Sequence, residues 1–239
     1  MSELKNVVYN MDCMDYMRTL PDKAFDLAIV DPPYGILAPK MNMGSAPNRH
    51  GKGQYPGIST AERMRRVRRD SGAGKLKNRA LNTMKCDWDD APPTQEYFDE
   101  LFRVSRNQII WGGNYFPLPP TRGIVCWDKQ QPWENFSQWE MAWTSFDCPA
   151  KLISLSNTGG RNDEQKIHPT QKPVRLYEWL LTKVARGGEL VLDTHVGSGS
   201  SRIACAELGF GFVGCEIDKT YWELQEKRFR DYSSQLRLF

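Results

Sequence analysis

Residues 187–223 read GGELVLDTHVGSGSSRIACAELGFGFVGCEIDKTYWE. The apolar run ELVLD predicts a buried strand, Gly197 and Gly199 predict a sharp turn, and the small residues that follow predict a helix. A second apolar strand then ends at Glu216, nineteen residues after Gly197. This order of strand, turn, helix and strand is typical of half of a nucleotide-binding fold. It predicts a parallel α/β sheet.

The glycine turn also predicts a ligand. Gly197 and Gly199 let the backbone approach a bound molecule without obstruction by a Cβ, and the following helix directs free N–H groups at a carboxylate. Glu216, at the end of the next strand, can accept hydrogen bonds from two ribose hydroxyls. These features favour a nucleoside-type cofactor, and a turn with a purely structural role is the alternative.

Apolar runs alternate with helical stretches along the rest of the chain, as in other parallel α/β proteins. Runs such as DLAIV and ELVLD are almost wholly apolar, as expected of strands that are covered on both faces. The pattern predicts helices over residues 94–106 and 174–185, the second ended by Gly187 and Gly188. It predicts seven strands, over residues 6–9, 25–30, 108–111, 123–127, 140–144, 189–193 and 211–216. The fold class is therefore α/β, a Rossmann-like, doubly wound and mostly parallel sheet in one domain of residues 1–239.

Residues 36–87 interrupt this pattern and are interpreted as a basic insertion. The formal net charge of +3 hides an asymmetry, because eleven Lys or Arg stand against two acids between Lys40 and Arg79. Such a concentration is typical of a surface that binds the phosphates of nucleic acids, and a solvated loop is the alternative. A short helix over residues 61–69 would present the expected DNA contacts: Arg63, Arg65, Arg66, Arg68 and Arg69.

Composition restricts the remaining classes of protein. The six cysteines are scattered, with no CxxC pair and no histidine spaced for zinc, so we expect reduced thiols and no metal. The first residues lack the pattern of a signal peptide, and eighteen apolar residues nowhere follow one another. We expect a cytoplasmic protein.

A second motif, Asp31-Pro32-Pro33-Tyr34, directly follows the apolar run FDLAIV. Prolines supply no N–H, so the Pro32 carbonyl faces outward as an acceptor, and Asp31 adds a second acceptor. Two acceptors can take both N–H groups of a planar amine, while Tyr34 can stack on the ring that carries it. These four residues are the predicted catalytic set, and a rigid turn with Tyr34 over the core is the alternative.

Six segments occur in a diagnostic order: YNMDCMDYM, DLAIVDPPY, NQIIWGGNYF, HPTQKP, VLDTHVGSGSS and GCEID. Over nearly its whole length the chain resembles the amino-methyltransferases of DNA that modify N6 of adenine or N4 of cytosine. It is most similar to their permuted, beta-type group, in which DPPY precedes the glycine-rich motif. The resemblance implies the fold of S-adenosylmethionine-dependent methyltransferases, with an antiparallel strand near residues 140–144. It also implies that the last strands lie at the centre of the sheet, beside the DPPY strand.

The resemblance implies a site for S-adenosylmethionine as well. Asp12 would hydrogen-bond the adenine amine of the cofactor, with Cys13 beside that ring, and Lys172 of HPTQKP would flank the methionine portion together with the glycine turn. The implied cofactor-binding residues are Asp12, Cys13, Asp31, Lys172, Asp193, Gly197, Ser198, Gly199 and Glu216. The glycine motif of the family usually begins Asp-Pro-Phe, whereas this chain has Asp193-Thr194-His195. We expect His195 to fill the space of an apolar side chain.

We therefore expect site-specific methyl transfer from S-adenosylmethionine to N6 of adenine in double-stranded DNA, by base flipping and direct in-line transfer. N4 of cytosine is the alternative, although relatives that modify it more often carry Ser in place of Asp31. Methyltransferases of RNA or of protein amides use an Asn-Pro-Pro-Tyr version of the motif. A nicotinamide oxidoreductase would not explain DPPY or HPTQKP, and a non-catalytic nucleic-acid-binding module would not need both motifs intact. A homodimer and a cognate restriction endonuclease remain open as partners.

Overall fold

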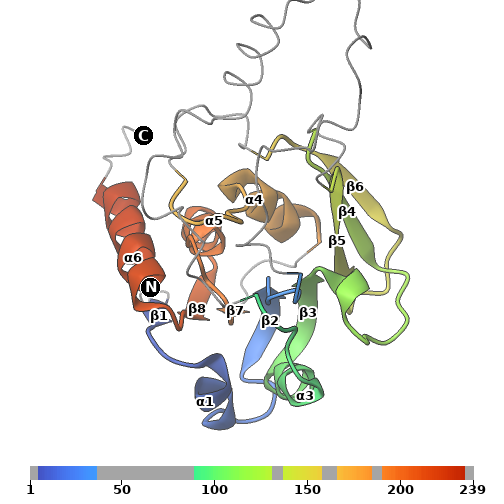
Figure 1. Cartoon of the computed structure of the whole chain (residues 1–239), viewed down its shortest axis with the longest axis horizontal. Helices are drawn as coiled ribbons and strands as arrows, with labels where there is room; N and C mark the ends of the chain where they lie inside the picture. Colours follow the sequence, from blue (N-terminus) through green and yellow to red (C-terminus); the bar gives the residue numbers. More distant parts are fainter. Residues whose placement is uncertain (1–4, 37–88, 131–136, 158–165, 185–189, 235–239) are drawn as a thin grey trace, which may run out of the picture.

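The apolar runs of the sequence form one eight-stranded sheet (Figure 1). The computed structural model describes residues 5–36, 89–130, 137–157, 166–184 and 190–234, and the structural statements below concern these ranges. The strands are β1 (Asn6–Tyr9), β2 (Phe25–Val30), β3 (Ser105–Trp111), β4 (Ile124–Asp128), β5 (Trp139–Thr144), β6 (Lys151–Ser154), β7 (Leu190–Asp193) and β8 (Gly211–Cys215). The helices are α1 (Cys13–Arg18), α3 (Gln95–Val104), the short 3-10 helix η3 (Gly113–Tyr115), α4 (Val174–Lys183), α5 (Ser200–Leu208) and α6 (Lys219–Ser234). Within the described ranges, none of the helices combines the length and apolar character that a membrane span requires.

The strand order agrees with the doubly wound topology expected from the sequence. Neighbouring strands follow the order β1-β8-β7-β2-β3-β5-β4-β6. The first five are parallel, whereas β5 runs antiparallel to both β3 and β4. The expected antiparallel strand is thus confirmed, and so is the position of β7 directly beside β2 near the centre of the sheet. From this central pair the sheet continues through β8 on one side and through β3 on the other.

One strand was not predicted from the sequence. The expected count of seven omits β6, which pairs in parallel with β4 at the edge of the sheet. Its four residues alternate between half-buried and exposed, and Leu152 is 68% exposed. Because an edge strand of this kind buries no apolar run, the sequence KLIS carries no hydrophobic signal that would distinguish it from a loop.

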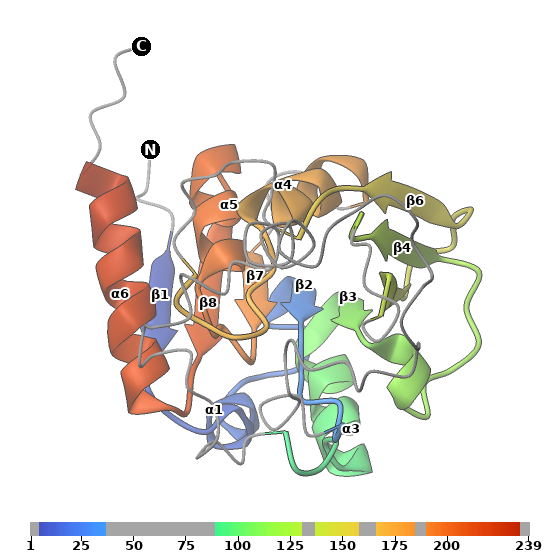
Figure 2. The same ribbon diagram turned by 45° about the horizontal axis from the view of Figure 1, so that its top comes forward.

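Alternate residues of the central strands pack against helices on opposite faces of the sheet. Leu27 and Ile29 of β2 belong to the core cluster formed with α4 and α5, whereas Ala28 and Val30 belong to the cluster formed with α1 and α3. Figures 1 and 2 show these two helix layers on the two sides of the strands. Burial on both faces is the physical reason why this strand reads as a continuous apolar run.

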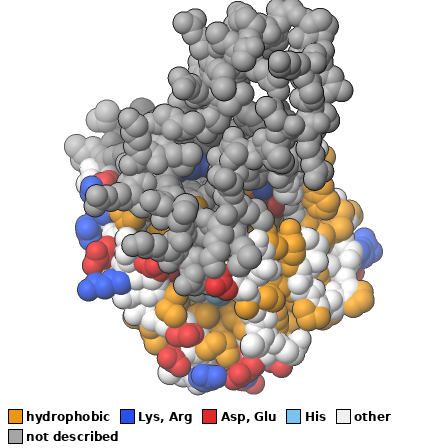
Figure 3. All heavy atoms as spheres, viewed as in Figure 1, with side chains coloured by type: hydrophobic (Ala, Val, Ile, Leu, Met, Phe, Trp, Pro, Cys, Tyr) orange, Lys and Arg blue, Asp and Glu red, His pale blue; other side chains and the backbone are white. Residues whose placement is uncertain are grey.

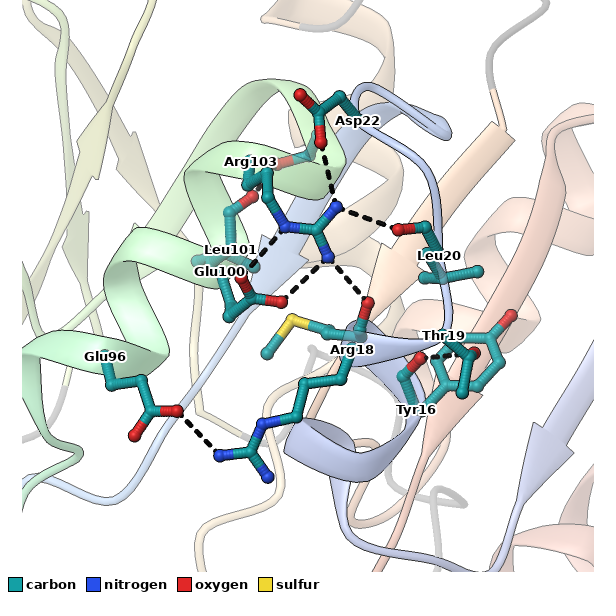
Figure 4. Close-up of polar contacts among 11 residues, drawn as sticks. Tyr16, Arg18, Thr19, Leu20, Asp22, Glu96, Glu100, Leu101 and Arg103 are labelled. Atoms are coloured by element: carbon teal, nitrogen blue, oxygen red, sulfur yellow. Dashed lines mark hydrogen bonds and ion pairs between the residues drawn. The ribbon is translucent and has the colours of Figure 1, made fainter.

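Arg103 in the last turn of α3 fastens this helix to the chain around α1 (Figure 4). Its guanidinium donates hydrogen bonds to the main-chain oxygens of Met17 and Leu20, at 2.9 and 2.8 Å. It also pairs with Glu100 and Asp22, at 2.8 and 2.9 Å. The carbonyl groups at the end of α1 therefore receive donors from a neighbouring helix, which holds α1 in place against the sheet.

The insertion begins and returns at one place beside the DPPY turn. The backbone N–H of Gly35 donates to the buried carboxylate of Asp89 over 2.9 Å. Gly35 has φ of +71°, and a Cβ there would lie 2.5 Å from Cδ of Pro92. Residues 37–88 lie outside the described ranges, and with them the short helix predicted over residues 61–69 and its five arginines. Gly187 and Gly188 are outside them too.

Candidate functional site

Four acidic residues lie where parallel strands end. Asp31 directly follows β2, Asp193 ends β7, Glu216 directly follows β8, and Asp12 lies three residues after β1. These four strands are neighbours and run in the same direction, so their carboxyl ends form one edge of the sheet. In open α/β sheets ligands bind at this edge, where the strand order reverses, and here the reversal lies between β7 and β2.

The glycine turn between β7 and α5 is held by carboxylates from both sides. Gly197 and Gly199 have φ of +53° and +75°, the left-handed conformation that glycine adopts without strain. The N–H of Gly197 donates to Oε2 of Glu216 over 2.8 Å, and the N–H of His195 donates to Oδ1 of Asp193 over 3.0 Å. The N-cap Gly199 contributes no side-chain hydrogen bond, so the start of α5 keeps N–H groups for a ligand.

Glu216 is buried but keeps acceptor capacity. Its side chain receives one backbone N–H on each oxygen, from Gly197 at 2.8 Å and from Asp218 at 2.9 Å. Burial raises the pKa of this carboxyl above its usual value, although the backbone N–H groups oppose the shift. A carboxylate has about four lone-pair positions, so each oxygen can accept one more hydrogen bond. Two neighbouring hydroxyls of a ribose match this capacity.

Asp193 lies deeper in the same turn. Only 2% of the residue is exposed, and its Oδ2 accepts a hydrogen bond of 2.5 Å from the Ser201 hydroxyl. Burial raises the pKa of this carboxyl from 3.8 to about 7, and the hydrogen bonds from Ser201 and His195 only partly oppose that shift. Asp193 therefore holds the glycine turn through hydrogen bonds from inside the protein, and Ser198 is buried within this turn.

Three residues after β1, Asp12 caps α1 through a hydrogen bond of 2.7 Å from the N–H of Met14 to its Oδ1. Cys13 follows at the first position of this helix and is half-buried. Burial, and next the charge of Asp12, raise the pKa of the Cys13 thiol to about 12. The thiol thus stays neutral at physiological pH and offers a small, weakly polar surface beside an exposed carboxylate.

The DPPY turn brings an acid and a phenol together. The hydroxyl of Tyr34 donates to Oδ1 of Asp31 over 2.6 Å, while Pro32 is buried and Pro33 half-buried. The Tyr34 ring stacks on Tyr115, with centroids 4.9 Å apart and 13° between the planes. Asp31 is thus oriented by its own motif. The exposed ring of Tyr115 covers the face of Tyr34 that, by the sequence prediction, stacks on a substrate base.

Lys172 lies on the DPPY side of the site. Its ammonium group is 2.5 Å from Oδ2 of Asp31 and 3.1 Å from Oε2 of Glu140 in β5. A hydrogen bond of 3.3 Å also joins it to the Tyr34 hydroxyl. The family resemblance implied contact with the methionine portion of a cofactor, which stays a prediction. The described contacts connect this lysine to the two acids and the phenol.

The HPTQKP segment nevertheless touches both motifs. The ring of His168, at its start, lies 3.7 Å from the position that a Cβ on Gly197 would take, and it packs edge-on against Tyr221. Burial, and next the charge of Lys172, lower the pKa of His168 to about 4. One short segment therefore places a neutral ring on the glycine turn and a lysine on the DPPY turn.

His195, the unusual residue of the glycine motif, packs edge-on against Tyr97 with ring centroids 5.6 Å apart. Its Nδ1 shares a hydrogen bond of 2.9 Å with the Thr194 hydroxyl, which also contacts the Tyr97 hydroxyl at 2.7 Å. Burial lowers the pKa of the imidazole to about 4, so the ring is neutral at physiological pH. This environment fits the space-filling role expected from the sequence.

Three residues of the site were not found by sequence reasoning: Gly112, Tyr115 and Glu140. Gly112 and Tyr115 belong to the segment NQIIWGGNYF, which carries part of the family resemblance but suggested no role for either residue. Glu140 is an acid within the strand WEMAWT, and such an acid needs a partner when the strand is covered. This need for a partner is the feature of the sequence that could have pointed to Glu140. Among the described residues, no group of three or more His, Cys, Asp or Glu is placed to hold a metal ion.

A family model described as DNA methylase matches residues 77–227. Among curated relatives, the type II methyltransferase M.BglII of Bacillus subtilis is 24% identical over an alignment 252 positions long, which covers 92% of this chain and 67% of that protein. The type II methyltransferase M.HpaI of Haemophilus parainfluenzae is 36% identical over 80 residues, which are 34% of this chain and only 26% of that protein.

Two solved structures are similar over almost the whole chain. The M1.HpyAVI–SAM complex has a TM-score of 0.53 at 20% identity, covering 92% of this chain and 98% of its own. The PvuII DNA methyltransferase, described as cytosine-N4-specific, has a TM-score of 0.57 at 12% identity, covering 98% and 89%. These similarities show the methyltransferase fold.

Proposed function

Since this chain belongs to the DNA methylase family that matches residues 77–227, we propose that it methylates DNA at N6 of adenine. Membership in the family makes S-adenosylmethionine the cofactor and amino groups of DNA bases the class of substrate. The pairing of β2 with β7 carries the proposal, because it sets the DPPY turn beside the glycine turn at one edge of the sheet.

The residues at this edge fit S-adenosylmethionine. Each oxygen of Glu216 has acceptor capacity for one ribose hydroxyl, and the start of α5, where Gly199 adds no capping side chain, can receive a carboxylate. Asp12 presents an exposed carboxylate to an adenine amine, with the neutral thiol of Cys13 beside it. The cofactor site that we propose also includes Asp31, Asp193, Gly197 and Ser198.

On the substrate side, the chain must hold an amine whose lone pair is delocalised into its ring. Duplex DNA hides that amine, so the target base has to leave the helix and enter the site. Asp31 and the Pro32 carbonyl would accept its two N–H groups, which stabilises the positive charge that develops on nitrogen. The rigid Pro32-Pro33 pair fixes both acceptors, and the base would stack on Tyr34 in place of Tyr115.

Bound S-adenosylmethionine supplies a methyl group that is already activated as part of a sulfonium. The remaining requirement is alignment, and the two motifs meet it from neighbouring strands. Asp31 orients the nitrogen from the end of β2, while the glycine turn after β7 fixes the donor. The HPTQKP segment links the two turns, because it contacts the glycine turn through His168 and the DPPY turn through Lys172.

Adenine is favoured over cytosine by Asp31, since relatives that modify N4 of cytosine more often carry Ser at this position. The second candidate target is N4 of cytosine, because the PvuII structure of similar fold is described as specific for it. Digestion of DNA methylated by the protein, followed by mass spectrometry of the nucleosides, separates the two. N6-methyladenine is the expected product, and N4-methylcytosine as sole product would establish the second candidate.

Transfer of a radiolabelled methyl group from S-adenosylmethionine to unmethylated duplex DNA tests the activity itself. Asp31→Asn keeps the shape of the side chain but lowers its acceptor strength, so we expect folded protein with strongly reduced transfer. Glu216→Gln should instead weaken cofactor binding in calorimetry. Cofactor binding as tight as that of the wild type in Glu216→Gln would remove Glu216 from the ribose site.

Residues 36–87 are proposed to contact DNA around the extruded base. The hydrogen bond between Gly35 and Asp89 supports this role, because both ends of the insertion leave the fold next to Tyr34. The proposed partners also include a second copy of the chain and a restriction endonuclease of the same specificity. Light scattering of the purified protein tests for the dimer. Resistance of DNA methylated by the protein to cleavage by an extract of the host cells tests for the endonuclease.

A further inference from the structure

Four charged side chains form a continuous row that starts at the DPPY turn. Oδ2 of Asp31 contacts the Lys172 ammonium at 2.5 Å, and this ammonium contacts Oε2 of Glu140 at 3.1 Å. On the other oxygen of Glu140 lies the ammonium of Lys129, just after β4. The row therefore connects the proposed catalytic acid to β5, a strand that carries neither motif.

The row is shielded from water. The side chain of Lys172 is 4% exposed, and those of Asp31 and Glu140 are 18% and 20% exposed. Burial alone would lower the pKa of Lys172, but the charges of Asp31 and Glu140 outweigh it and raise the pKa. Burial would likewise raise the pKa of Glu140, but Lys172 and Lys129 lower it. The charges of Lys172 and Glu140 are thus maintained by their neighbours in the row.

Lys172 is restrained from several directions at once. Its ammonium lies 5.7 Å from the ring centroid of Tyr34 and 5.2 Å from that of Trp111. A lysine side chain is flexible and carries a compact charge, so one partner alone does not fix its position. Here Asp31 lies on one side of the ammonium, and Glu140 provides the second anionic anchor.

The sum of the charges next to the target amine explains why a second acid is useful. Asp31 and Lys172 alone form a neutral pair, which would attract a developing positive charge only weakly. Glu140 adds one negative charge to this pair. Lys129 adds one positive charge, which makes the row neutral in total, but it is the member farthest along the row from Asp31. A lysine can then orient the catalytic acid without cancelling its electrostatic effect on the amine.

We propose that Lys172 and Glu140 are positioning residues for Asp31. Glu140 holds the Lys172 ammonium, and this ammonium fixes Oδ2 of Asp31, so that the lone pairs of the Asp31 carboxylate stay directed at the target amine. The inference rests on the proposed function and deepens it. It assigns Lys172 to the substrate side of the site, and it gives β5 a part in catalysis through Glu140.

The test uses the full chain and separates binding from methyl transfer. Cofactor affinity is measured by calorimetry, and methyl transfer to unmethylated genomic DNA is measured under single-turnover conditions. Lys172→Met should leave cofactor affinity nearly unchanged and slow transfer by about 100-fold, the typical cost of misplacing a reacting group by about 1 Å.

Glu140→Gln provides a second variant in case the buried lysine is needed for folding. It keeps the volume of the side chain and should slow methyl transfer by a smaller factor, again with cofactor affinity retained. Glu140→Asp, which keeps the charge, should recover part of the rate. The exposed residues Lys183 and Glu207 give matched controls, since Lys183→Met and Glu207→Gln should behave as wild type in every measurement.

Two results would overturn the inference. One is methyl transfer at the rate of the wild type in both Lys172→Met and Glu140→Gln. The other is a loss of cofactor affinity in Lys172→Met as large as its loss of rate, which would return Lys172 to the methionine side. Failure of the proposed function is distinct, because the wild-type protein itself would then transfer no label to DNA.

Discussion

The position of the Tyr34 ring depends on the lack of a side chain at Gly112. Gly112 has φ of +69°, and a Cβ there would lie 2.2 Å from Cε1 of Tyr34. Its neighbour η3 then places Tyr115 on the ring face. The glycine in NQIIWGGNYF therefore serves two needs at once, a left-handed backbone and room for the aromatic ring of the DPPY motif.

Gly112→Ala should reduce stability and methyl transfer together. The left-handed backbone alone costs an alanine roughly 1–2 kcal/mol, and the contact with Tyr34 adds displacement of a ring in the proposed base site. Gly209→Ala is the matched control, because Gly209 has φ of +76° but nothing within 4 Å of the added Cβ. It should lose stability while methyl transfer persists. Equal activity in the two variants would argue against steric control of Tyr34 by Gly112.

Asp193 should make stability depend on pH in a predictable direction. Burial raises its pKa to about 7 from 3.8, so between these values the folded state keeps a proton that the unfolded state has released. Its contribution to the free energy of unfolding is therefore full below about pH 4 and falls as pH rises toward 7, by at most about 1.4 kcal/mol per pH unit. Asp193→Asn should flatten this part of the profile in urea titrations, whereas Asp231→Asn at an exposed site should not. A slope unchanged in Asp193→Asn would contradict the assignment.

Among the elements, α1 depends on α3 through one arginine. Arg103→Met removes hydrogen bonds to the carbonyls of Met17, in the last turn of α1, and of Leu20, just after this helix, and should clearly lower the free energy of unfolding. Arg18→Met is the control, since the ion pair between Arg18 and Glu96 is more than half exposed on both sides and contributes little. Chemical denaturation of both variants provides the comparison, and equal losses would mean that Arg103 does not fasten the two helices.

The strands show which element boundaries the hydrophobic pattern of the sequence can predict. Strands β1 and β2 have the predicted bounds, because apolar residues bordered by polar ones mark a covered strand at both ends. Helix α3 is shorter than the predicted range 94–106, since Ser105 and Arg106 already belong to β3. Periodicity cannot detect that boundary, because the chain passes from helix to strand without a glycine or proline. The edge strand β6 was not predicted for a related reason, because it contains no run of buried apolar residues.

The predicted site residues came from motifs, and the structure adds contacts that motifs do not encode. Placing Asp31 and Glu216 at strand ends needed only the order of strands and turns, and the structure has both there. The pairing of Lys172 with Glu140 depends on β5 lying between β3 and β4, which brings a distant strand beside the DPPY turn. A single sequence without a known topology contains no measure of that distance.

At the scale of the whole molecule, charge is divided unequally along the chain. The described residues contain 17 Lys or Arg and 21 Asp or Glu, whereas residues 40–79 contain eleven basic residues against two acids. On the face in Figure 3, the described surface shows acidic, basic and hydrophobic side chains close together. A surface of mixed sign gives little general attraction for DNA phosphates. We therefore expect most of the affinity for DNA to reside in residues 36–87.

This division of charge leads to a test of the insertion. Replacing Arg65, Arg66 and Arg69 with Ala should weaken binding to duplex DNA and reduce the dependence of log K on log salt by roughly one unit for each phosphate that an arginine no longer neutralises. Cofactor affinity should stay the same, because the glycine turn is not altered. Lys183→Ala and Arg230→Ala remove exposed charges from the body of the fold and should leave the slope close to that of the wild type. An unchanged slope with normal methylation in the triple variant would identify the arginines as part of a solvated loop.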